Sequence, residues 1–217
     1  MTMLKIWGRR NSLNVQKAMW VVGELGLAHE RVDAGGPFGG LETAEFAALN
    51  PNRRVPVIDD GGVVVWESHS ILRYLAARYG AGTLWAEDAA ARSLADRWID
   101  WTLADLQPAF IGGVFMTLYR TPEAQRNWNA IKRGLARTAE LMALLDRHLA
   151  DKAFLAGDFF TMGDIPAGAQ LYRYFTMEIE RPPLPNVEAW YARLKERPAY
   201  REHVMVPYDD LRGKLTF

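Results

Sequence analysis

The residues of this 217-residue chain best suited to chemistry are a short polar run, Asn11-Ser12-Leu13-Asn14, placed directly before a helical pattern. Ser12 occupies the position of a helix N-cap, where the first backbone N–H groups of the helix have no partner within it. A hydroxyl there, with Asn11 and Asn14 as neighbouring amides, can donate hydrogen bonds to an anion. It can equally well only cap the helix, and the local sequence leaves both readings open.

A second polar group lies in the stretch from Asn50 to Tyr79. Two short apolar runs flank a turn around Gly61-Gly62, which is typical of a β-hairpin, and a helical pattern follows. Pro56 lies inside the first run, where its missing N–H favours an edge strand or a cis turn that presents backbone groups outward. Glu67 and Ser68 stand where the helix begins, with Ser68 at the expected N-cap. Together these residues predict a surface that binds a ligand.

The elements needed to position these groups follow from the apolar periodicity. The first 80 residues read as strand, helix, strand, helix, strand, strand, helix, and the first three form a βαβ unit with parallel strands. This order predicts a thioredoxin-like α/β domain over residues 1–80. After a linker at 80–88, residues 89–217 form helical patterns throughout, including a helix over 89–119 that is broken or kinked near Pro108 and another over 123–149. The predicted fold class is therefore α/β followed by an all-α domain.

Composition narrows the function. Lys plus Arg and Asp plus Glu number 26 each, so no net charge favours nucleic acid or an anionic membrane. No apolar run is long enough to span a bilayer, and we expect a cytoplasmic protein that binds neither membranes nor nucleic acid. The chain has no cysteine, which excludes disulfides, thiolate metal sites and any reaction through a thiol of its own. No metal site is expected.

The absence of cysteine bears on the role that Ser12 can have. In a thioredoxin-like domain the start of the first helix normally carries a reactive cysteine, and here a serine stands instead. A serine hydroxyl cannot perform redox chemistry, but it can donate to a thiolate that arrives on a ligand. Lowering a thiol pKa by roughly two units requires about 2.7 kcal/mol, which a hydroxyl donor and a helix N-terminus can supply together.

These motifs, in this order, resemble the cytosolic glutathione transferase superfamily across essentially the whole chain. The features that carry the resemblance are the loop from Asn11 to Lys17, Asn50-Pro51 with Arg54-Val55-Pro56-Val57, Glu67-Ser68, and Thr161 with Asp164 in the helical half. The first loop is most similar to a bacterial theta- or nu-like branch, in which serine or asparagine stabilises the glutathione thiolate. Ser12, Asn11 and Asn14 are therefore the candidate catalytic residues, and the resemblance does not rank them.

The resemblance also implies a glutathione-binding set. Val55, before a Pro56 expected to be cis, would pair with the cysteinyl backbone of glutathione, and Glu67 and Ser68 would hold its γ-glutamyl end. Asn52, Arg53 or Arg54 would meet the glycyl carboxylate. Arg53 stands where the family often has glycine, so the choice between the two arginines stays open. We expect His69, also a departure from the usual pattern, to face solvent in the first turn of its helix.

A second substrate would lie between the domains, with the C-terminal tail as a possible lid. The candidate apolar residues are Phe38, Phe110, Phe115, Tyr119, Tyr172 and Phe175. The resemblance implies a homodimer that uses glutathione as co-substrate and conjugates it to a small hydrophobic electrophile. Two alternatives remain open: glutathione-dependent reduction of disulfides or peroxides, and a non-catalytic protein that binds glutathione.

Overall fold

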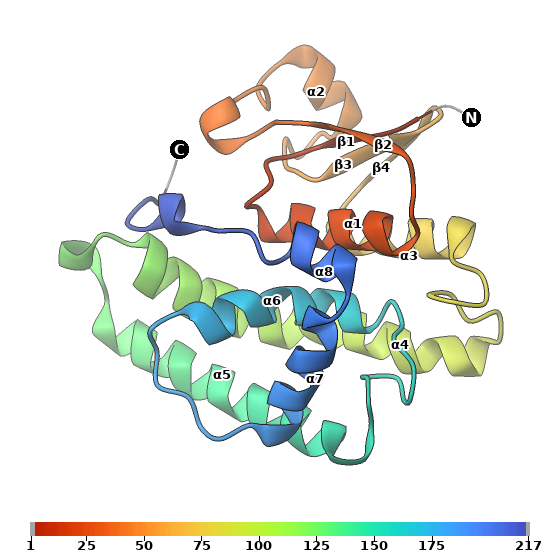
Figure 1. Cartoon of the computed structure of the whole chain (residues 1–217). Helices are drawn as coiled ribbons and strands as arrows, with labels where there is room; N and C mark the ends of the chain where they lie inside the picture. Colours follow the sequence, from red (N-terminus) through yellow and green to blue (C-terminus); the bar gives the residue numbers. More distant parts are fainter. Residues whose placement is uncertain (1–2, 216–217) are drawn as a thin grey trace.

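The computed structural model describes residues 3–215, which form a small sheet with its helices packed on a larger group of helices (Figure 1). The first half contains one four-stranded mixed sheet in the order β2-β1-β3-β4. Its elements are β1 (Leu4–Trp7), α1 (Leu13–Glu24), β2 (His29–Val32), α2 (Ala44–Leu49), β3 (Val57–Asp60), β4 (Val63–Trp66) and α3 (Ser68–Tyr79). The predicted thioredoxin-like topology is confirmed.

The strand pairing follows the sequence pattern closely. β1 pairs in parallel with β2, as expected for a βαβ unit, and antiparallel with β3. The β3–β4 hairpin turns at Gly61-Gly62, and both glycines have positive φ (63° and 96°), a conformation that side chains other than glycine rarely adopt. Ile6 and Ile58 lie opposite each other across the sheet and are fully buried. This face packs on α1 and α3 (Figure 1).

The second half is all-helical, as predicted. Its main elements are α4 (Ala89–Trp101), η2 (Thr102–Leu106), η3 (Pro108–Arg120), α5 (Trp128–His148), α6 (Asp164–Thr176), α7 (Pro185–Lys195), α8 (Pro198–His203) and the short turn η6 (Asp209–Leu211). The helix begun at α4 continues past Pro108 in wider π-type turns, so the proline is absorbed and does not end the helix. No helix among residues 3–215 has the length and apolar character needed to cross a membrane.

Three predicted helix starts were wrong. α5 begins at Trp128 and not at Glu123, because the side chain of Asn127 accepts from the N–H of Ala130 (3.1 Å) and caps the helix there. Ser68 is the first residue of α3 and not its N-cap, which is Glu67. The spacing of Thr161 and Asp164 also predicts a helix N-cap at Thr161, but the N-cap of α6 is Gly163. The carboxylate half of that motif is present: buried Asp164 accepts from the N–H of Thr161 (2.9 Å), and also from Trp190 Nε1 (3.1 Å).

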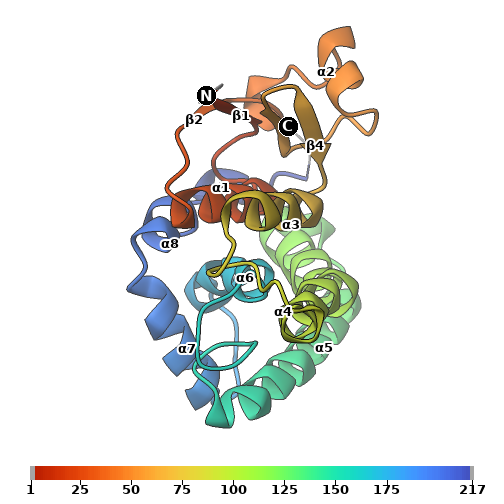
Figure 2. The same cartoon turned by 90° about the vertical axis from the view of Figure 1, so that its right-hand side faces the viewer.

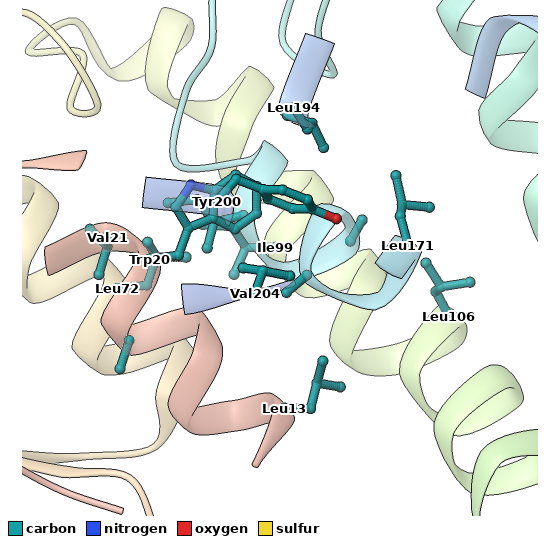
Figure 3. Close-up of a cluster of buried hydrophobic side chains, with 14 of the residues drawn as sticks. Leu13, Trp20, Val21, Leu72, Ile99, Leu106, Leu171, Leu194, Tyr200 and Val204 are labelled. Carbon is teal, nitrogen blue, oxygen red and sulfur yellow. The ribbon is translucent and has the colours of Figure 1, made fainter. Parts of the chain in front are cut away.

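Helix α1 joins the two halves. It lies between the sheet and the helices α6 and α8 (Figure 2). Trp20 of α1 is fully buried against Tyr200 of α8, with ring centroids 4.7 Å apart, and Gly168 of α6 leaves room for its ring. Side chains from both halves meet in this cluster (Figure 3). The N-terminal end of α1, which carries Ser12, is therefore held against the helical half.

Candidate functional site

The loop before α1 presents Ser12 at the helix N-terminus. Ser12 is the N-cap by its backbone (φ −78°, ψ 123°), and its carbonyl accepts from the N–H of Gln16 at 2.8 Å. Its hydroxyl makes no capping hydrogen bond. The hydroxyl therefore remains available to donate to a ligand, close to the unpartnered N–H groups of the first turn of α1.

The two asparagines of the loop are held differently. Asn11 Nδ2 donates to both carboxylate oxygens of Asp210, at 2.9 and 2.7 Å, in the C-terminal tail. Asn14 uses its side-chain oxygen to accept from Lys17 Nζ at 3.1 Å, so its amide nitrogen faces away from the lysine. Asn14 is thereby placed as a donor, whereas the Asn11 amide is occupied by the tail.

All three loop residues line one cavity of about 200 Å³ between the loop and the helical half. Its lining consists of Arg9, Asn11, Ser12, Leu13, Asn14, Gln107, Ile111, Phe115, Met116, Arg120, Arg173 and Leu211. η3 and α6 supply one wall, and Leu211 of the tail turn η6 supplies another. The structure thus brings the predicted catalytic loop, the helical half and the tail together at one place.

The predicted glutathione-binding residues lie beside this loop. The Val55–Pro56 peptide bond is cis, as the resemblance implied, and a side chain at Gly8 would reach within 3.2 Å of Val55 Cβ. Val55 therefore borders the loop that leads to Ser12. No side chain larger than glycine fits at Gly8, which also has positive φ (151°). Glycine at position 8 therefore allows the loop before Ser12 to lie close to the Val55 segment.

The turn before α3 carries the acidic part of this surface. Glu67 has φ of 69°, a conformation that is costly for a residue with a side chain and that turns the backbone sharply between β4 and α3. Its side chain is exposed, and Ser68 after it is buried at the first turn of α3. The free N–H groups of that turn and the Glu67 carboxylate lie together, as a ligand with both a carboxylate and an ammonium requires.

The three candidates for the glycyl carboxylate occupy the turn after α2. Buried Asn50 organises this turn: its side chain accepts from the N–H of Asn52 (2.9 Å) and donates to the carbonyl of Arg54 (2.8 Å). Arg53 has positive φ (51°) and pairs with Glu42 at 2.5 Å. Arg54 and Asn52 are exposed. The geometry therefore favours Arg54 over Arg53 as the cation available to a ligand.

Lys17 is a buried cation beside the candidate site, and the sequence pattern did not single it out. It is fully buried in the middle of α1, and its ammonium group contacts Asn14, His69 (3.1 Å) and Gln107. Burial, and secondarily the positive charge of Arg173, lowers the pKa of Lys17 to about 7, while Glu67 opposes this shift. Lys17 therefore connects the loop, the start of α3 and the helical half.

The expectation that His69 faces solvent was wrong. His69 is 5% exposed and lies against the ammonium group of Lys17. Burial, followed by the charges of Lys17 and Arg73, lowers the pKa of His69 to about 2, so its ring is neutral and can accept from the lysine. No local sequence pattern indicates this contact, because the two residues are 52 positions apart.

Of the six aromatic candidates for the second substrate, only Phe115 lines the cavity. Phe110 is buried in the core against Tyr174, and Phe38 is 54% exposed on the turn η1 (Gly36–Phe38). The remaining three, Tyr119, Tyr172 and Phe175, pack respectively on Phe115, on Tyr208 and on Tyr191. The apolar part of the lining comes instead from Ile111, Met116 and Leu211.

Three arginines from distant parts of the chain, none of them predicted, lie in the same lining: Arg9, Arg120 and Arg173. Arg173 is 3% exposed and lies over the ring of Phe115 at 4.8 Å. Burial, and to a smaller extent the positive charges of Arg9 and Arg120, lower the pKa of Arg173 to about 10, while Tyr208 opposes this shift. The pair Arg9-Arg10 in the loop was the one sequence signal that could have indicated a cationic site.

The sequence matches known family descriptions over both halves. Residues 11–78 match "Glutathione S-transferase, N-terminal domain", and residues 106–198 match "Glutathione S-transferase, C-terminal domain". The chain is 41% identical to glutathione S-transferase GstB of Escherichia coli over 94% of this chain and 99% of the relative. The chain belongs to the glutathione S-transferase family. The predicted superfamily and enzyme class are thus confirmed.

Solved structures agree with this assignment. The glutathione-bound theta class glutathione S-transferase of Xanthomonas axonopodis pv. citri superimposes with a TM-score of 0.91 at 47% identity, over 95% of this chain and 99% of the other. The apo form of that theta class enzyme gives a TM-score of 0.82. These relatives support the theta-like branch and glutathione as the co-substrate. Residues 3–215 contain no cluster of three His, Asp or Glu side chains suited to a metal ion.

Proposed function

We propose that this glutathione S-transferase binds glutathione between the Ser12 loop and the Val55–Ser68 surface and stabilises its thiolate with the Ser12 hydroxyl. The observation that carries the proposal is the state of that hydroxyl: it lies at the N-terminus of α1, lines the cavity, and is not used to cap the helix. Asn14 is the second donor, because Lys17 fixes its oxygen, and Asn11 follows, since Asp210 holds its amide.

In the proposed complex the backbone of Val55 pairs with the cysteinyl unit of glutathione. Glu67 accepts from the γ-glutamyl ammonium, and Ser68 with the first N–H groups of α3 binds the neighbouring carboxylate. Arg54 or Asn52 meets the glycyl carboxylate, with Arg53 occupied by Glu42. A tripeptide bound at both ends in this way would place its central thiol next to Ser12.

The reaction we propose is conjugation. Ionisation of the thiol releases a proton to solvent, and the thiolate attacks the electrophilic carbon of the second substrate in the cavity. The new sulfur–carbon bond forms while the leaving group departs with its electron pair. The protein contributes thiolate stabilisation and positioning, and no covalent bond to the chain is formed.

Titration of the bound thiol tests this proposal. Glutathione is bound to the wild type and to Ser12→Ala, Asn14→Ala and Asn11→Ala, and thiolate formation is followed by its ultraviolet absorbance across pH. We expect Ser12→Ala to raise the pKa of the bound thiol by about one to two units, Asn14→Ala by less, and Asn11→Ala least. A wild-type thiol pKa equal to that of free glutathione, with no turnover of an aryl halide, would leave a protein that only binds glutathione.

Disulfide reduction is the second candidate function. The observation that favours it is the cationic lining of the cavity, which fits the carboxylates of a second glutathione molecule better than it fits a purely apolar electrophile. Turnover of 2-hydroxyethyl disulfide with glutathione, compared with turnover of an aryl halide by the same preparation, decides between the two reactions. The predicted homodimer is part of the proposal and is tested by sedimentation of the purified protein.

A further inference from the structure

Lys17 is fully buried in α1, and its amine contacts three side chains from three separate segments. Nζ lies 3.1 Å from Asn14 Oδ1 in the first turn of α1, 3.1 Å from His69 Nε2 in α3, and within hydrogen-bond distance of Gln107 Oε1 between η2 and η3. This one buried amine therefore connects the loop beside Ser12 to the helical half.

The contacts of Lys17 fix the direction of two carboxamides. Asn14 and Gln107 both accept from Nζ through their side-chain oxygens, and the nitrogen of a carboxamide lies on the other side of its carbonyl carbon. Each NH2 group therefore faces away from the lysine. Neither nitrogen donates to another group of residues 3–215, and neither is buried away from a ligand. Two oriented donors remain unused.

This orientation does not depend on the charge of Lys17. An ammonium group donates three hydrogen bonds, two to the amide oxygens and one to His69 Nε2. A neutral amine donates two, to the same oxygens, and its lone pair accepts from Nε2–H of the other His69 tautomer. The two amides keep their direction in both states.

The two amides border the same cavity from different halves of the protein. Asn14 belongs to α1, next to Ser12 and the proposed place of the thiol, whereas Gln107 belongs to the helical half. Leu13 and Leu106, their neighbours in the chain, are buried in the cluster of Figure 3 and hold the two backbone segments. Gln107 is therefore placed to donate to the second substrate.

We infer that Gln107 is a catalytic donor that stabilises negative charge on the second substrate, and that Lys17 is its positioning residue. The inference rests on the proposed function, since it concerns the electrophile of that site. It assigns a class of electrophile: molecules with an oxygen acceptor conjugated to the reacting carbon, such as nitroarenes and α,β-unsaturated carbonyl compounds. A pre-oriented donor is most effective where charge develops in the transition state.

Two chlorides differ in the place where this charge develops. When the thiolate adds to the chlorine-bearing carbon of 1-chloro-2,4-dinitrobenzene, a sulfur–carbon bond forms and a ring electron pair moves onto a nitro oxygen. The pair returns to the ring as the carbon–chlorine bond breaks and chloride leaves. In benzyl chloride the thiolate displaces chloride directly, and the charge passes only to chlorine. Gln107 should therefore accelerate the first reaction and not the second.

The ratio of the two reactions tests the donor. Each kcat/KM is divided by the rate of the uncatalysed reaction with glutathione, and the ratio of dinitrobenzene to benzyl chloride is compared between variants. Gln107→Met, which has a similar shape and no N–H, should lower this ratio roughly tenfold. Gln107→Glu, which keeps an acceptor for Lys17 and has no N–H, should lower it at least as far.

Gln125→Met is the matched control, because it removes an amide from the exposed turn η4 (Glu123–Gln125), which does not line the cavity. Its ratio should equal that of the wild type. A wild-type ratio in Gln107→Met and Gln107→Glu would overturn the inference.

A double-mutant cycle tests the positioning role of Lys17. Lys17→Met removes the group that orients the amide, and it should lower the same ratio. If Lys17 acts through Gln107, the variant with both substitutions to methionine loses no more than Gln107→Met alone. A purely structural effect of Lys17→Met would slow both reactions equally, and an unaltered ratio would contradict the positioning role.

The bound thiol provides a further readout of the same variants. Its pKa, followed by thiolate absorbance, should be the same in Gln107→Met as in the wild type, because the amide is assigned to the electrophile. A higher pKa in Gln107→Met would mean that the amide donates to the thiolate, which contradicts that assignment.

Binding without turnover separates failure of this inference from failure of the proposed function. 1,3,5-Trinitrobenzene has no leaving group, so addition of the glutathione thiolate stops at a coloured anionic adduct whose formation constant follows from visible absorbance. At about pH 9.5 most of a thiol with pKa about 8.5 is ionised without help from Ser12. We expect the adduct on Gln107→Met to form with a constant roughly tenfold lower than on the wild type.

That loss would support the inference even in a protein that leaves the thiol pKa unaltered. Equal formation constants for the wild type and Gln107→Met would overturn it even where Ser12 lowers the thiol pKa.

Discussion

The two sides of the site beside Ser12 are built in opposite ways. The proposed glutathione side comes from one continuous stretch, residues 50–69, in which a turn organised by Asn50, a hairpin and the start of α3 follow each other directly. The proposed second-substrate side is assembled from the loop after β1, from η3, from α6 and from the tail. One side depends on local backbone conformation and the other on tertiary packing.

This difference explains how one fold can keep its co-substrate and change its second substrate. Backbone N–H groups at a helix terminus bind a carboxylate whatever the neighbouring side chains are. The cavity wall instead consists of single side chains from the loop after β1, from η3, from α6 and from the tail, and these can change one at a time. Arg9, Arg120 and Arg173 belong to this replaceable part of the cavity lining.

The largest predicted effect falls on the glutathione side. Glu67→Gln keeps the shape of the side chain but removes the negative charge that would accept from the γ-glutamyl ammonium. A charge-assisted hydrogen bond contributes about 2–3 kcal/mol, so we expect KM for glutathione to rise roughly 100-fold. Steady-state kinetics with varied glutathione measure the change, and KM for the second substrate should move far less.

The exposed residue Glu45 of α2 provides the control, because Glu45→Gln removes the same charge from the same half of the protein. It should leave KM for glutathione within about twofold of the wild type. An equal rise in both variants would mean that net charge, and not a contact at Glu67, determines the affinity. A rise in KM for both substrates of Glu67→Gln would show that the two sides are not separable.

Much of the glutathione side could be predicted from sequence, for the same reason that it is local. Gly61-Gly62, Pro56 and Glu67-Ser68 occupy fixed offsets within one supersecondary unit, and each leaves a signal in the residue types. The Ser12 loop could be predicted because a helix N-terminus follows from periodicity. The fold class was accessible by the same means, since the order of strands and helices determines it.

The cavity wall could not be predicted, because nothing in a single sequence indicates which side chains converge. Phe110 and Phe175 have the residue type expected of an apolar pocket, yet one is core and the other stacks on Tyr191. In the sequence Arg173 is an isolated polar residue of a buried helix. Only the structure shows that Arg9 and Arg120 line the same cavity. His69 was misjudged for the same reason, because its partner Lys17 belongs to another element.

Lys17 lies between the two sides and offers the next test. Its pKa is lowered to about 7 in the folded protein, so between about pH 7.5 and 9.5 the unfolded chain binds a proton that the folded chain does not. The free energy of unfolding should therefore rise with pH, by about 1 kcal/mol per unit relative to Lys17→Met, which lacks this titration. Urea unfolding without glutathione at several pH values measures the difference.

Neighbouring groups do not obscure this result. His69, with its pKa lowered to about 2, is neutral in both states above pH 7, so it contributes no slope. Lys5→Met is the control, because it removes a lysine from an exposed position on β1, and its curve should run parallel to that of the wild type. If the curve for Lys17→Met also ran parallel to that of the wild type, Glu67 would be keeping Lys17 charged in the folded protein. The two sides would then be coupled electrostatically.

The smallest predicted effect concerns the sign of the charge in the cavity. Asp210 is a carboxylate that opposes the positive charges of Arg9 and Arg120, so Asp210→Asn should strengthen binding of an anionic second substrate such as 4-chloro-3,5-dinitrobenzoate. An exposed charge in this position is partly screened, and we expect KM for 4-chloro-3,5-dinitrobenzoate to fall about threefold. Asparagine can still accept from Asn11, so the tail keeps its contact. Asp151→Asn, which removes an exposed charge paired with Lys152, should leave that KM unaltered. A rise in KM for Asp210→Asn would mean that the tail acts through the position of Asn11 and not through its charge. The second-substrate side would then depend on backbone position, as the glutathione side does.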